Sequence, residues 1–269
     1  MGPLRYPRHV PELPEVESYR RLAETAVDRS IASVATPDAW YLKSGTTGPT
    51  LRRLLVGHRF TAARRRGKLL LLDTDGGPVV GIRFGMTGLL TVDGASSVGQ
   101  LISVPRRDNP AWDRCIVRFD DGGAMAVRDP RRLGGIVVDP SLTHLGPDAL
   151  SITRGQLAAA LGGSVAPLKA RLLDQSKVAG IGNLIADEVL WRTGLSPERP
   201  ARSLSPADVG RLHRRVALLH QIAEVGSAPF HEETQGSAHP GGRCPRDGEE
   251  LTRSTIGGRT TWWCPTHQQ

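Results

Sequence analysis

The sequence has few cysteines and no long apolar run, and each shortage excludes a class of protein. Three cysteines in 269 residues do not make a disulfide framework. No stretch of about 18 apolar residues occurs, so no membrane span is expected. Residues 1–10 lack the apolar segment of a secretory signal. We therefore expect a cytoplasmic protein without a membrane partner.

Lysine is also scarce, although positive charge is in excess. There are 31 arginines and 4 lysines, a bias typical of a GC-rich genome. The net charge is +8 and the isoelectric point is near 10.1. An acidic partner is expected, with phosphate backbones first because neutralising them releases counterions. Solubility alone is the alternative explanation of the charge. The length suits one large domain or two of ordinary size.

The first half of the chain changes from a helical to a strand pattern. Val16, Tyr19, Leu22 and Ala23 recur at helical spacing, which predicts a helix from Pro14 to about residue 27. Short β-type runs then follow from about residue 31 to 138, separated by turn signals at residues 75–77 and 121–123. This pattern predicts a β-sandwich with a helix attached. Cys115 lies in one of the runs and is expected to be a small buried side chain.

The second half is helical, then loop-like, and ends in a compact tail. Residues 226–243 are rich in Gly, Ser, His and Pro and predict a loop, and residues 244–267 predict a metal-stapled hairpin. The whole chain is predicted to have an α+β fold. The candidate helices are Leu157–Leu161, Leu168–Leu173, Asn183–Thr193 and Pro206–Ile222.

The segment from Pro11 to Glu17, which reads Pro-Glu-Leu-Pro-Glu-Val-Glu, is the most informative motif. It resembles the N-terminus of the formamidopyrimidine-DNA glycosylase / endonuclease VIII family, and further landmarks of that family follow in order along the chain. These landmarks are Arg65–Lys68, Gly85–Gly88, Asp129–Gly134, Leu145–Leu150, Leu172–Gln175 and Gly180–Leu184.

The resemblance implies an architecture and an activity. The fold would be an N-terminal catalytic β-sandwich domain (11–140), a helix-two-turn-helix DNA-binding domain (148–225) and a zinc-finger-like hairpin (240–269). The activity would be that of a monomeric bifunctional DNA glycosylase/AP lyase of base excision repair. It would remove oxidised bases from damaged double-stranded DNA through an N-terminal proline Schiff base, and it would nick the strand by β,δ-elimination. Such a protein would be associated with the bacterial nucleoid.

Catalysis in that family starts from the free amine of a first-residue proline. By resemblance Pro11 is this nucleophile and Glu12 the general acid/base, with Lys68 at the phosphate and sugar of the lesion. An α-amino group has a pKa of about 7.7–8.0, against about 10.4 for lysine, so much more of it is unprotonated at neutral pH. For Glu15 we favour a structural role as a carboxylate at a helix N-terminus, where the helix dipole stabilises it. The same role is the alternative for Glu12.

Pro11 is internal in this sequence, and an amide nitrogen cannot attack carbon because its lone pair is delocalised into the carbonyl. Val10 is the literal reading of GTG, an alternative bacterial start codon. We therefore expect residues 1–10 to be a misassigned or removed extension. A true extension that blocks Pro11 would instead give a catalytically inactive protein that binds damaged DNA. A structural or regulatory DNA binder built on a zinc hairpin is a further alternative.

Other family positions concern DNA binding. Met86 matches a wedge that fills the hole left by a flipped base, with core packing as its alternative. Arg131 matches the arginine that faces the orphaned base, and Leu133 replaces an aromatic residue usual in the formamidopyrimidine branch. Lys169 and Asn183 match residues that grip phosphates, although Asn183 would also suit an N-cap. Arg259 matches an arginine at the tip of the finger hairpin that holds the phosphates at the lesion.

The tail carries four candidate metal ligands. Cys244 and Asp247 are separated by sixteen residues from Cys264 and His267, the same spacing as a family pattern of two Cys-x2-Cys pairs. Asp and His both bind zinc tetrahedrally, so a structural Zn2+ is expected, and a metal-free hairpin is the alternative. The stretch from Gly226 to Arg243 is shorter than the capping loop of enzymes that favour 8-oxoguanine. Oxidised pyrimidines, ring-opened purines and hydantoins remain open as substrates.

Overall fold

The structure is a computed structural model that describes residues 11–96, 109–219 and 237–269. The chain forms two compact units that divide between Leu142 and Thr143. No helix in the described part of the chain is long and apolar enough to cross a membrane.

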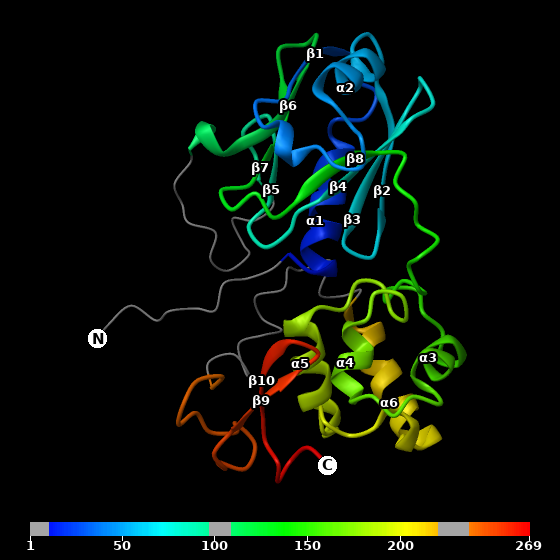
Figure 1. Ribbon diagram of the computed structural model, residues 1–269, viewed down its shortest axis with the longest axis vertical. Coiled ribbons are helices and arrows are strands. Elements are labelled where there is room, and N and C mark those ends of the chain that lie inside the picture. The colour runs from blue at the N-terminus through cyan, green and yellow to red at the C-terminus, as the bar shows by residue number, and fades with distance from the viewer. Residues whose placement is uncertain (1–10, 97–108, 220–236) are drawn as a thin grey trace. The chain divides into compact units, whose positions relative to one another are not determined.

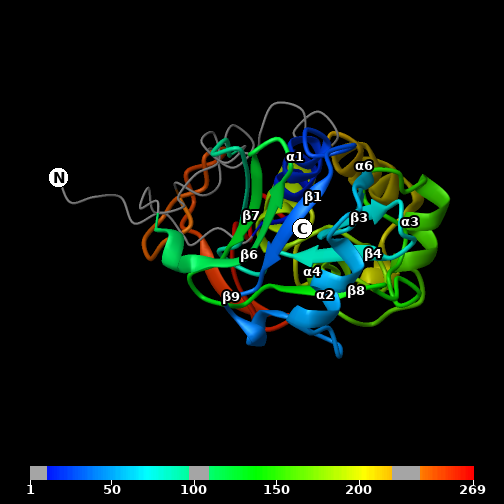
Figure 2. The ribbon, with the colours of Figure 1, turned by 90° about the horizontal axis from the view of Figure 1, so that it is seen from above.

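The first unit contains two four-stranded antiparallel sheets (Figures 1 and 2). One has the order β1-β6-β7-β5 and the other β2-β3-β4-β8. Residues from both sheets form one hydrophobic core, which confirms the predicted β-sandwich. The strands are β1 (Ile31–Ala35), β2 (Phe60–Arg66), β3 (Leu69–Thr74), β4 (Val79–Arg83), β5 (Leu89–Val92), β6 (Asp113–Phe119), β7 (Ala124–Arg128) and β8 (Gly135–Val138).

Two features of this core follow directly from the sequence. The turns at residues 75–77 and 121–123 join β3 to β4 and β6 to β7, with positive φ angles of 99° at Gly77 and 87° at Gly122 that glycine adopts without strain. Cys115 on β6 is buried, and burial raises the pKa of its thiol to about 12. It is therefore a small apolar core residue, as predicted.

Helix α1 (Leu13–Glu24) packs between elements of both sheets, because it contacts β2, β3 and β5. Its apolar face includes Val16 and Tyr19, both almost fully buried. The Tyr19 hydroxyl donates to the Gly88 carbonyl at 3.1 Å. The helix ends before the predicted residue 27, because the Thr25 hydroxyl bonds to the Leu22 carbonyl at 2.7 Å at its C-cap.

One helix of this unit was not predicted. Helix α2 (Gly48–Leu55) begins after Thr47, whose side chain accepts from the Thr50 amide. It buries Leu51 and Leu55, which lie four residues apart. The hydroxyl cap and the leucine spacing are helix signals within a segment whose neighbours read as strands. Short 3₁₀ turns lie at Ala39–Tyr41, Pro110–Trp112 and, in the second unit, Ala201–Ser203.

The described residues of the second unit form four α-helices and a hairpin, in agreement with the predicted helical domain and tail. The bounds of the second and third helices match those predicted. The first begins earlier than predicted, at Arg154 after the N-cap Thr153, and the fourth ends at Ala217 with Leu218 as its C-cap, before the predicted residue 222. Most of the predicted loop at residues 226–243 lies outside the described residues. The elements are α3 (Arg154–Leu161), α4 (Leu168–Leu173), α5 (Asn183–Thr193), α6 (Pro206–Ala217), β9 (Thr252–Ile256) and β10 (Arg259–Trp263).

Candidate functional site

Pro11 and Glu12 stand immediately before α1. Pro11 is half-buried, and Glu12, the N-cap residue, is only 1% exposed. The Glu12 amide donates to Glu15 Oε2 at 2.9 Å, and the two residues form a capping box. Glu15 thus has the structural role expected for it. Helix capping therefore fixes the backbone of Glu12.

A buried ion pair connects this helix to the turn that carries Lys68. Arg65 on β2 donates from Nε to Glu17 Oε2 on α1 at 3.0 Å and from Nη1 to the Gly67 carbonyl at 2.8 Å. The Arg65 and Glu17 side chains are 6% and 12% exposed. Lys68 follows Gly67 in the turn between β2 and β3 and is half-buried. Arg65 therefore holds the Lys68 turn against the helix whose N-cap is Glu12.

The loop of Met86 and the loop of Arg131 and Leu133 share one organising carboxylate. Asp129 is 0% exposed. Its Oδ1 accepts from the Thr87 hydroxyl at 2.6 Å and from the Arg131 amide at 3.1 Å, and its Oδ2 accepts from the Gly134 amide at 2.9 Å. The two loops also touch directly: a Cβ added at Gly85 would lie 2.5 Å from the Gly134 amide nitrogen.

These loops present side chains outward. Leu133 is 48% exposed, and Arg131 is exposed as well. Met86 is half-exposed and lies outside the buried core of the first unit, unlike the core-packing alternative. Met86 is thus brought onto a loop that neighbours the loop of Arg131 and Leu133, which lies far from it in sequence.

Arg132 lies between Arg131 and Leu133, and its side chain forms an ion pair within the protein. Its Nε and Nη2 donate to the two Asp38 carboxylate oxygens at 2.6 and 2.7 Å. Burial opposes ionisation of Asp38, but the guanidinium groups of Arg132 and Arg114 and the Trp40 amide together lower the pKa of the carboxyl. Arg132 has a φ of 58°, a left-handed conformation that non-glycine residues seldom adopt. The Asp38 contact stabilises this bend of the loop.

In the second unit, Asn183 is the first residue of α5. Gly182 is the N-cap, so Asn183 does not have the plain capping role considered above. The preceding turn is held by Gln175, which donates to the Ile181 carbonyl at 2.8 Å and accepts from the Gly180 amide at 3.0 Å. Asn183 Oδ1 has no hydrogen-bond partner within the described residues. The backbone N–H groups of a helix N-terminus and the side-chain Nδ2 of an asparagine can donate to a phosphate oxygen.

Lys169 lies in an interior position. It is 0% exposed, and its Nζ lies 2.6 Å from Asp187 Oδ1 on α5. The same Nζ donates to Thr261 Oγ1 at 2.6 Å on β10. Lys169 therefore joins α4 to α5 and to the hairpin, and in this structure its ammonium group faces protein rather than solvent.

Arg259 stands at the tip of the hairpin. Gly257 and Gly258 form the two-residue turn with φ angles of 58° and 71°, the conformation that tight hairpins require. Arg259 follows and is exposed. Its guanidinium has no ion pair with any residue that the structure describes.

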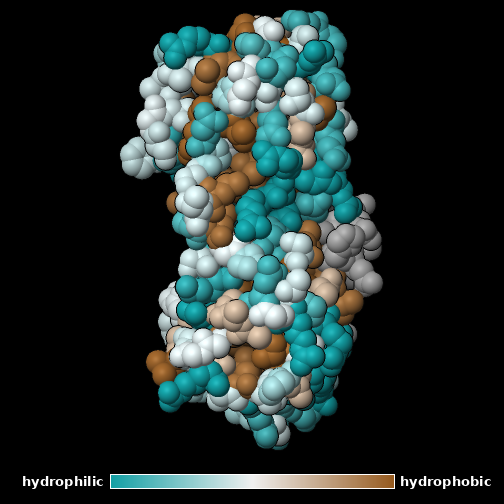
Figure 3. Space-filling view, turned by 90° about the vertical axis from the view of Figure 1, so that its right-hand side faces the viewer, coloured by the Kyte–Doolittle hydropathy of each residue, from teal (hydrophilic) through white to brown (hydrophobic). Residues whose placement is uncertain are grey.

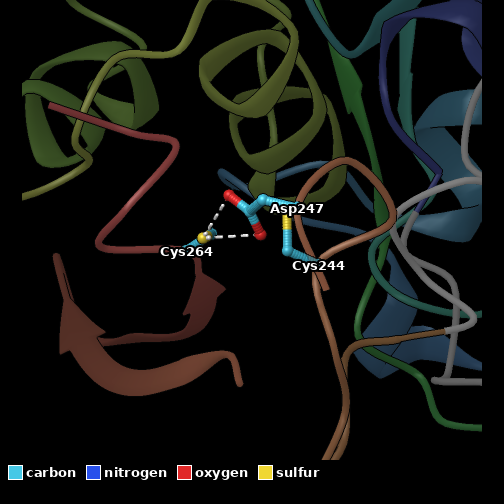
Figure 4. A group of neighbouring side chains, drawn as sticks. All are labelled: Cys244, Asp247 and Cys264. Carbon is cyan, nitrogen blue, oxygen red and sulfur yellow. Dashed lines mark hydrogen bonds between the residues drawn. The ribbon is translucent and has the colours of Figure 1, made fainter. Parts of the chain in front are cut away.

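Three of the four candidate metal ligands gather in one group. One ligand atom from each of Cys244, Asp247 and Cys264 lies within 4.8 Å of the others (Figure 4). Cys264 Sγ is 3.3 Å from Asp247 Oδ2. His267 is outside this group; its Nε2 lies 2.7 Å from the Trp191 carbonyl. Two thiols and a carboxylate fit a divalent metal ion, and an Nε2–H bonded to a carbonyl leaves Nδ1 as the nitrogen able to bind one.

Sequence reasoning assigned no roles to Glu17, Arg65, Asp129 and Asp187, which hold the candidate residues in place. Glu17, Arg65 and Asp129 fall within quoted motifs. Their partners lie 48, 42 or 5 residues away. Spacing along the sequence gives no signal for the two contacts that span more than 40 residues.

Two family descriptions match the chain. The formamidopyrimidine-DNA glycosylase N-terminal domain matches residues 10–136, and the H2TH domain of the same enzyme matches residues 145–228. Formamidopyrimidine-DNA glycosylases of Azorhizobium caulinodans and Paracoccus denitrificans are each 33% identical to the chain. Both alignments cover 97% of this chain and 100% of the relative.

Solved structures of Lactococcus lactis formamidopyrimidine-DNA glycosylase are also similar. The enzyme bound non-covalently to DNA with an AP site is 26% identical, and its complex with DNA containing an oxidised pyrimidine is 25% identical. Each superimposes with a TM-score of 0.81 over 96% of this chain and 100% of the solved chain.

Proposed function

Because this chain belongs to the formamidopyrimidine-DNA glycosylase family, we propose that Pro11 is its catalytic amine and that Glu12 and Lys68 act beside it. The protein is a DNA glycosylase of base excision repair with AP lyase activity, and its partner is damaged duplex DNA. The observation that carries the residue assignment is the Glu17–Arg65–Gly67 connection, which joins the Pro11–Glu12 end of α1 to the Lys68 turn.

The proposed chemistry starts with Pro11 at the N-terminus, which requires loss or absence of residues 1–10. The family match begins at residue 10, one residue before Pro11. The secondary amine attacks C1′ of the damaged nucleoside, the bond between C1′ and the base breaks, and the released base takes up a proton from water. Glu12 takes the proton that the amine loses and passes it to the sugar ring oxygen as the ring opens, which gives an iminium ion. Proton loss from C2′ would allow β-elimination of the 3′ phosphate, and δ-elimination would follow.

The outward residues of the first unit would support base flipping. Met86 and Leu133 would fill the space left by the extruded base, and Arg131 would face the orphaned base. Leucine fills space by apolar contact but stacks less well than an aromatic ring, so we propose a weaker preference for the opposite base. Asn183 and Arg259 would contact phosphates of the DNA backbone.

We propose that Cys244, Asp247, Cys264 and His267 bind a structural Zn2+ ion. Zinc would supply no chemistry to the reaction; it would hold residues 244–267 together and thereby fix Arg259. Binding would require His267 to bring Nδ1 toward the other three ligands. Acting on chromosomal DNA, the protein would work as a monomer in the bacterial cytoplasm, at the nucleoid.

Borohydride trapping on a duplex with an abasic site tests the assignment, because borohydride reduces the iminium ion to a stable protein–DNA adduct. The 269-residue chain is compared with a protein that begins at Pro11. An adduct only from the Pro11 start is expected, and Glu12→Gln should lower its yield. If neither protein forms an adduct while both bind the duplex, the assignment of Pro11 is wrong and the inactive binding protein is favoured.

A further inference from the structure

A pocket in the helical unit lies outside the residues assigned to catalysis and DNA binding. Its volume is about 240 Å³. It is framed by α3, α6 and the 3₁₀ turn at Ala201–Ser203, on the side of the unit where α3 and α6 lie (Figure 1). Figure 3 views the molecule from that side, and in its lower half hydrophobic residues are flanked by hydrophilic ones. The lining includes Ala158, Leu161, Leu204, Val209, Arg154 and Arg202.

The pocket wall is largely apolar, and its charged side chains are positive. Arg154 and Arg202 line it, and within the part of the chain that the structure describes no acidic side chain does. Arg214 stands beside Arg154, because a Cβ added at Gly210 would lie 3.5 Å from Arg154 Cζ and 3.6 Å from Arg214 Nη1. The nearest acidic residue on α6 that the structure describes, Asp208, is already paired. Its partners are Arg199 at 3.1 Å and Arg211 at 2.7 Å.

The Arg154 side chain and the Arg202 backbone are held in position. Arg154 Nη2 donates to the Pro206 carbonyl at 2.7 Å, which ties the start of α3 to the start of α6. The Arg202 amide donates to the Ser164 carbonyl at 2.8 Å, while its side chain is exposed and has no ion pair within the described residues. A guanidinium that is already positioned, as that of Arg154 is, loses less entropy when it binds a carboxylate.

We propose that this pocket binds the C-terminus of an acidic partner peptide whose last residue is large and apolar. A cavity of about 150 Å³ admits benzene, so this pocket has room for one aromatic or branched side chain. The terminal carboxylate lies on the same Cα as that side chain, and Arg202 and Arg154 at the rim match it by charge-assisted bidentate hydrogen bonds. Preceding acidic residues match Arg214. Duplex DNA fits less well, because its phosphates offer nothing to bury against an apolar wall.

The test uses the 269-residue protein and a labelled probe peptide, Asp-Asp-Gly-Asp-Leu-Phe with a free carboxylate, followed by fluorescence anisotropy. Saturable binding is expected, with affinity reduced by about tenfold or more when the carboxylate is amidated or when Leu-Phe is replaced by Gly-Gly. Ala158→Trp should fill the pocket and abolish binding. Ala159→Trp, on the same helix but outside the lining, is its matched control.

Charge reversal supplies a second matched pair. Arg202→Glu should abolish peptide binding, and Arg53→Glu, at an exposed arginine of the first unit, should not. Glycosylase activity should be unchanged in all four variants. The proposal is overturned if the peptide does not bind, or if Ala158→Trp and Arg202→Glu bind it normally. It is also overturned if duplex DNA displaces the peptide and Arg202→Glu weakens DNA binding, because the arginines would then serve the DNA backbone.

Discussion

Arg65 and Glu17 form an ion pair of 3.0 Å that joins the second strand to the first helix in a largely buried setting. Arg64, the next residue on β2, pairs instead with Asp73 at the surface, where its side chain is 52% exposed. Within the basic run, Arg65 therefore makes a buried ion pair and Arg64 an exposed one. These two arginines allow a buried and an exposed contact to be compared on one strand.

Arg65→Ala should lower the free energy of unfolding by about 1–3 kcal/mol, because it leaves Glu17 with fewer partners in a buried position. It should also slow borohydride trapping by the Pro11-start protein, since the Lys68 turn loses its attachment to α1. Arg64→Ala should change stability by about 0–1 kcal/mol and leave trapping unchanged. Equal trapping rates for the two folded variants would refute the positioning role of Arg65.

Asp129→Asn should disturb the two loops of Met86 and Arg131. An amide keeps one acceptor oxygen, so either the Thr87 and Arg131 contacts or the Gly134 contact is lost, at a cost of about 1–3 kcal/mol. Affinity for a duplex with an abasic site should fall, as measured by titration at fixed salt. Asp120→Asn, at an exposed carboxylate, is the control. Unchanged affinity in Asp129→Asn would mean that these loops do not contact the lesion.

Leu133→Ala should affect DNA binding without affecting stability. Because the side chain is 48% exposed, its truncation should change the free energy of unfolding by no more than about 0.5 kcal/mol. Loss of an inserted apolar side chain should still weaken binding to abasic duplex relative to intact duplex. Leu133→Phe should strengthen it by stacking. Val56→Ala, at a residue 42% exposed on the first unit, serves as the control, and equal effects at the two positions would exclude a wedge.

Periodicity and motif order predicted most of the architecture, because they report local structure. The bounds of α4 and α5 match the apolar spacing of their segments, and the strand run of Cys115 is buried as its pattern indicated. Helix α2 was missed because eight residues between strands give a short periodic signal. The positions of Met86 and Arg131 on adjacent loops depend on Asp129, and that contact spans 42 residues between Thr87 and Asp129. No local pattern encodes it.

Zinc binding by the four proposed ligands should depend on pH. Burial raises the pKa of the Cys264 thiol to about 11, so zinc must displace its proton, and apparent affinity should increase as the pH rises from about 6 to 8. Asp247→Ala should weaken binding and Asp247→Cys should strengthen it, as measured by competition with a chromophoric chelator. His267→Ala should weaken binding by about tenfold or more if its Nδ1 is the fourth ligand. Unchanged affinity would leave His267 as a packing residue against Trp191.

A substitution of Lys169 can test whether this lysine binds a DNA phosphate or only makes contacts inside the protein. A lysine that neutralises a phosphate contributes about 0.9 to the slope of log K against log salt concentration. Since Lys169 Nζ is buried between Asp187 and Thr261, Lys169→Met should leave this slope unchanged. It should instead destabilise the protein by about 3–5 kcal/mol, because Asp187 loses its buried partner. Thermal unfolding and DNA titration at several salt concentrations give the two quantities separately.

Arg259→Met is the matched control, because its guanidinium is exposed at the hairpin tip. It should lower the salt slope by about 0.9 and barely change stability. If Lys169→Met behaves in the same way, the lysine leaves its buried position when DNA binds. If it only destabilises, and Lys169→Met with Asp187→Leu restores stability, the lysine positions the hairpin from inside the helical unit. The double variant removes the unpaired Asp187 carboxylate but does not restore the hydrogen bond to Thr261. The stability that it recovers therefore measures the cost of the unpaired carboxylate alone.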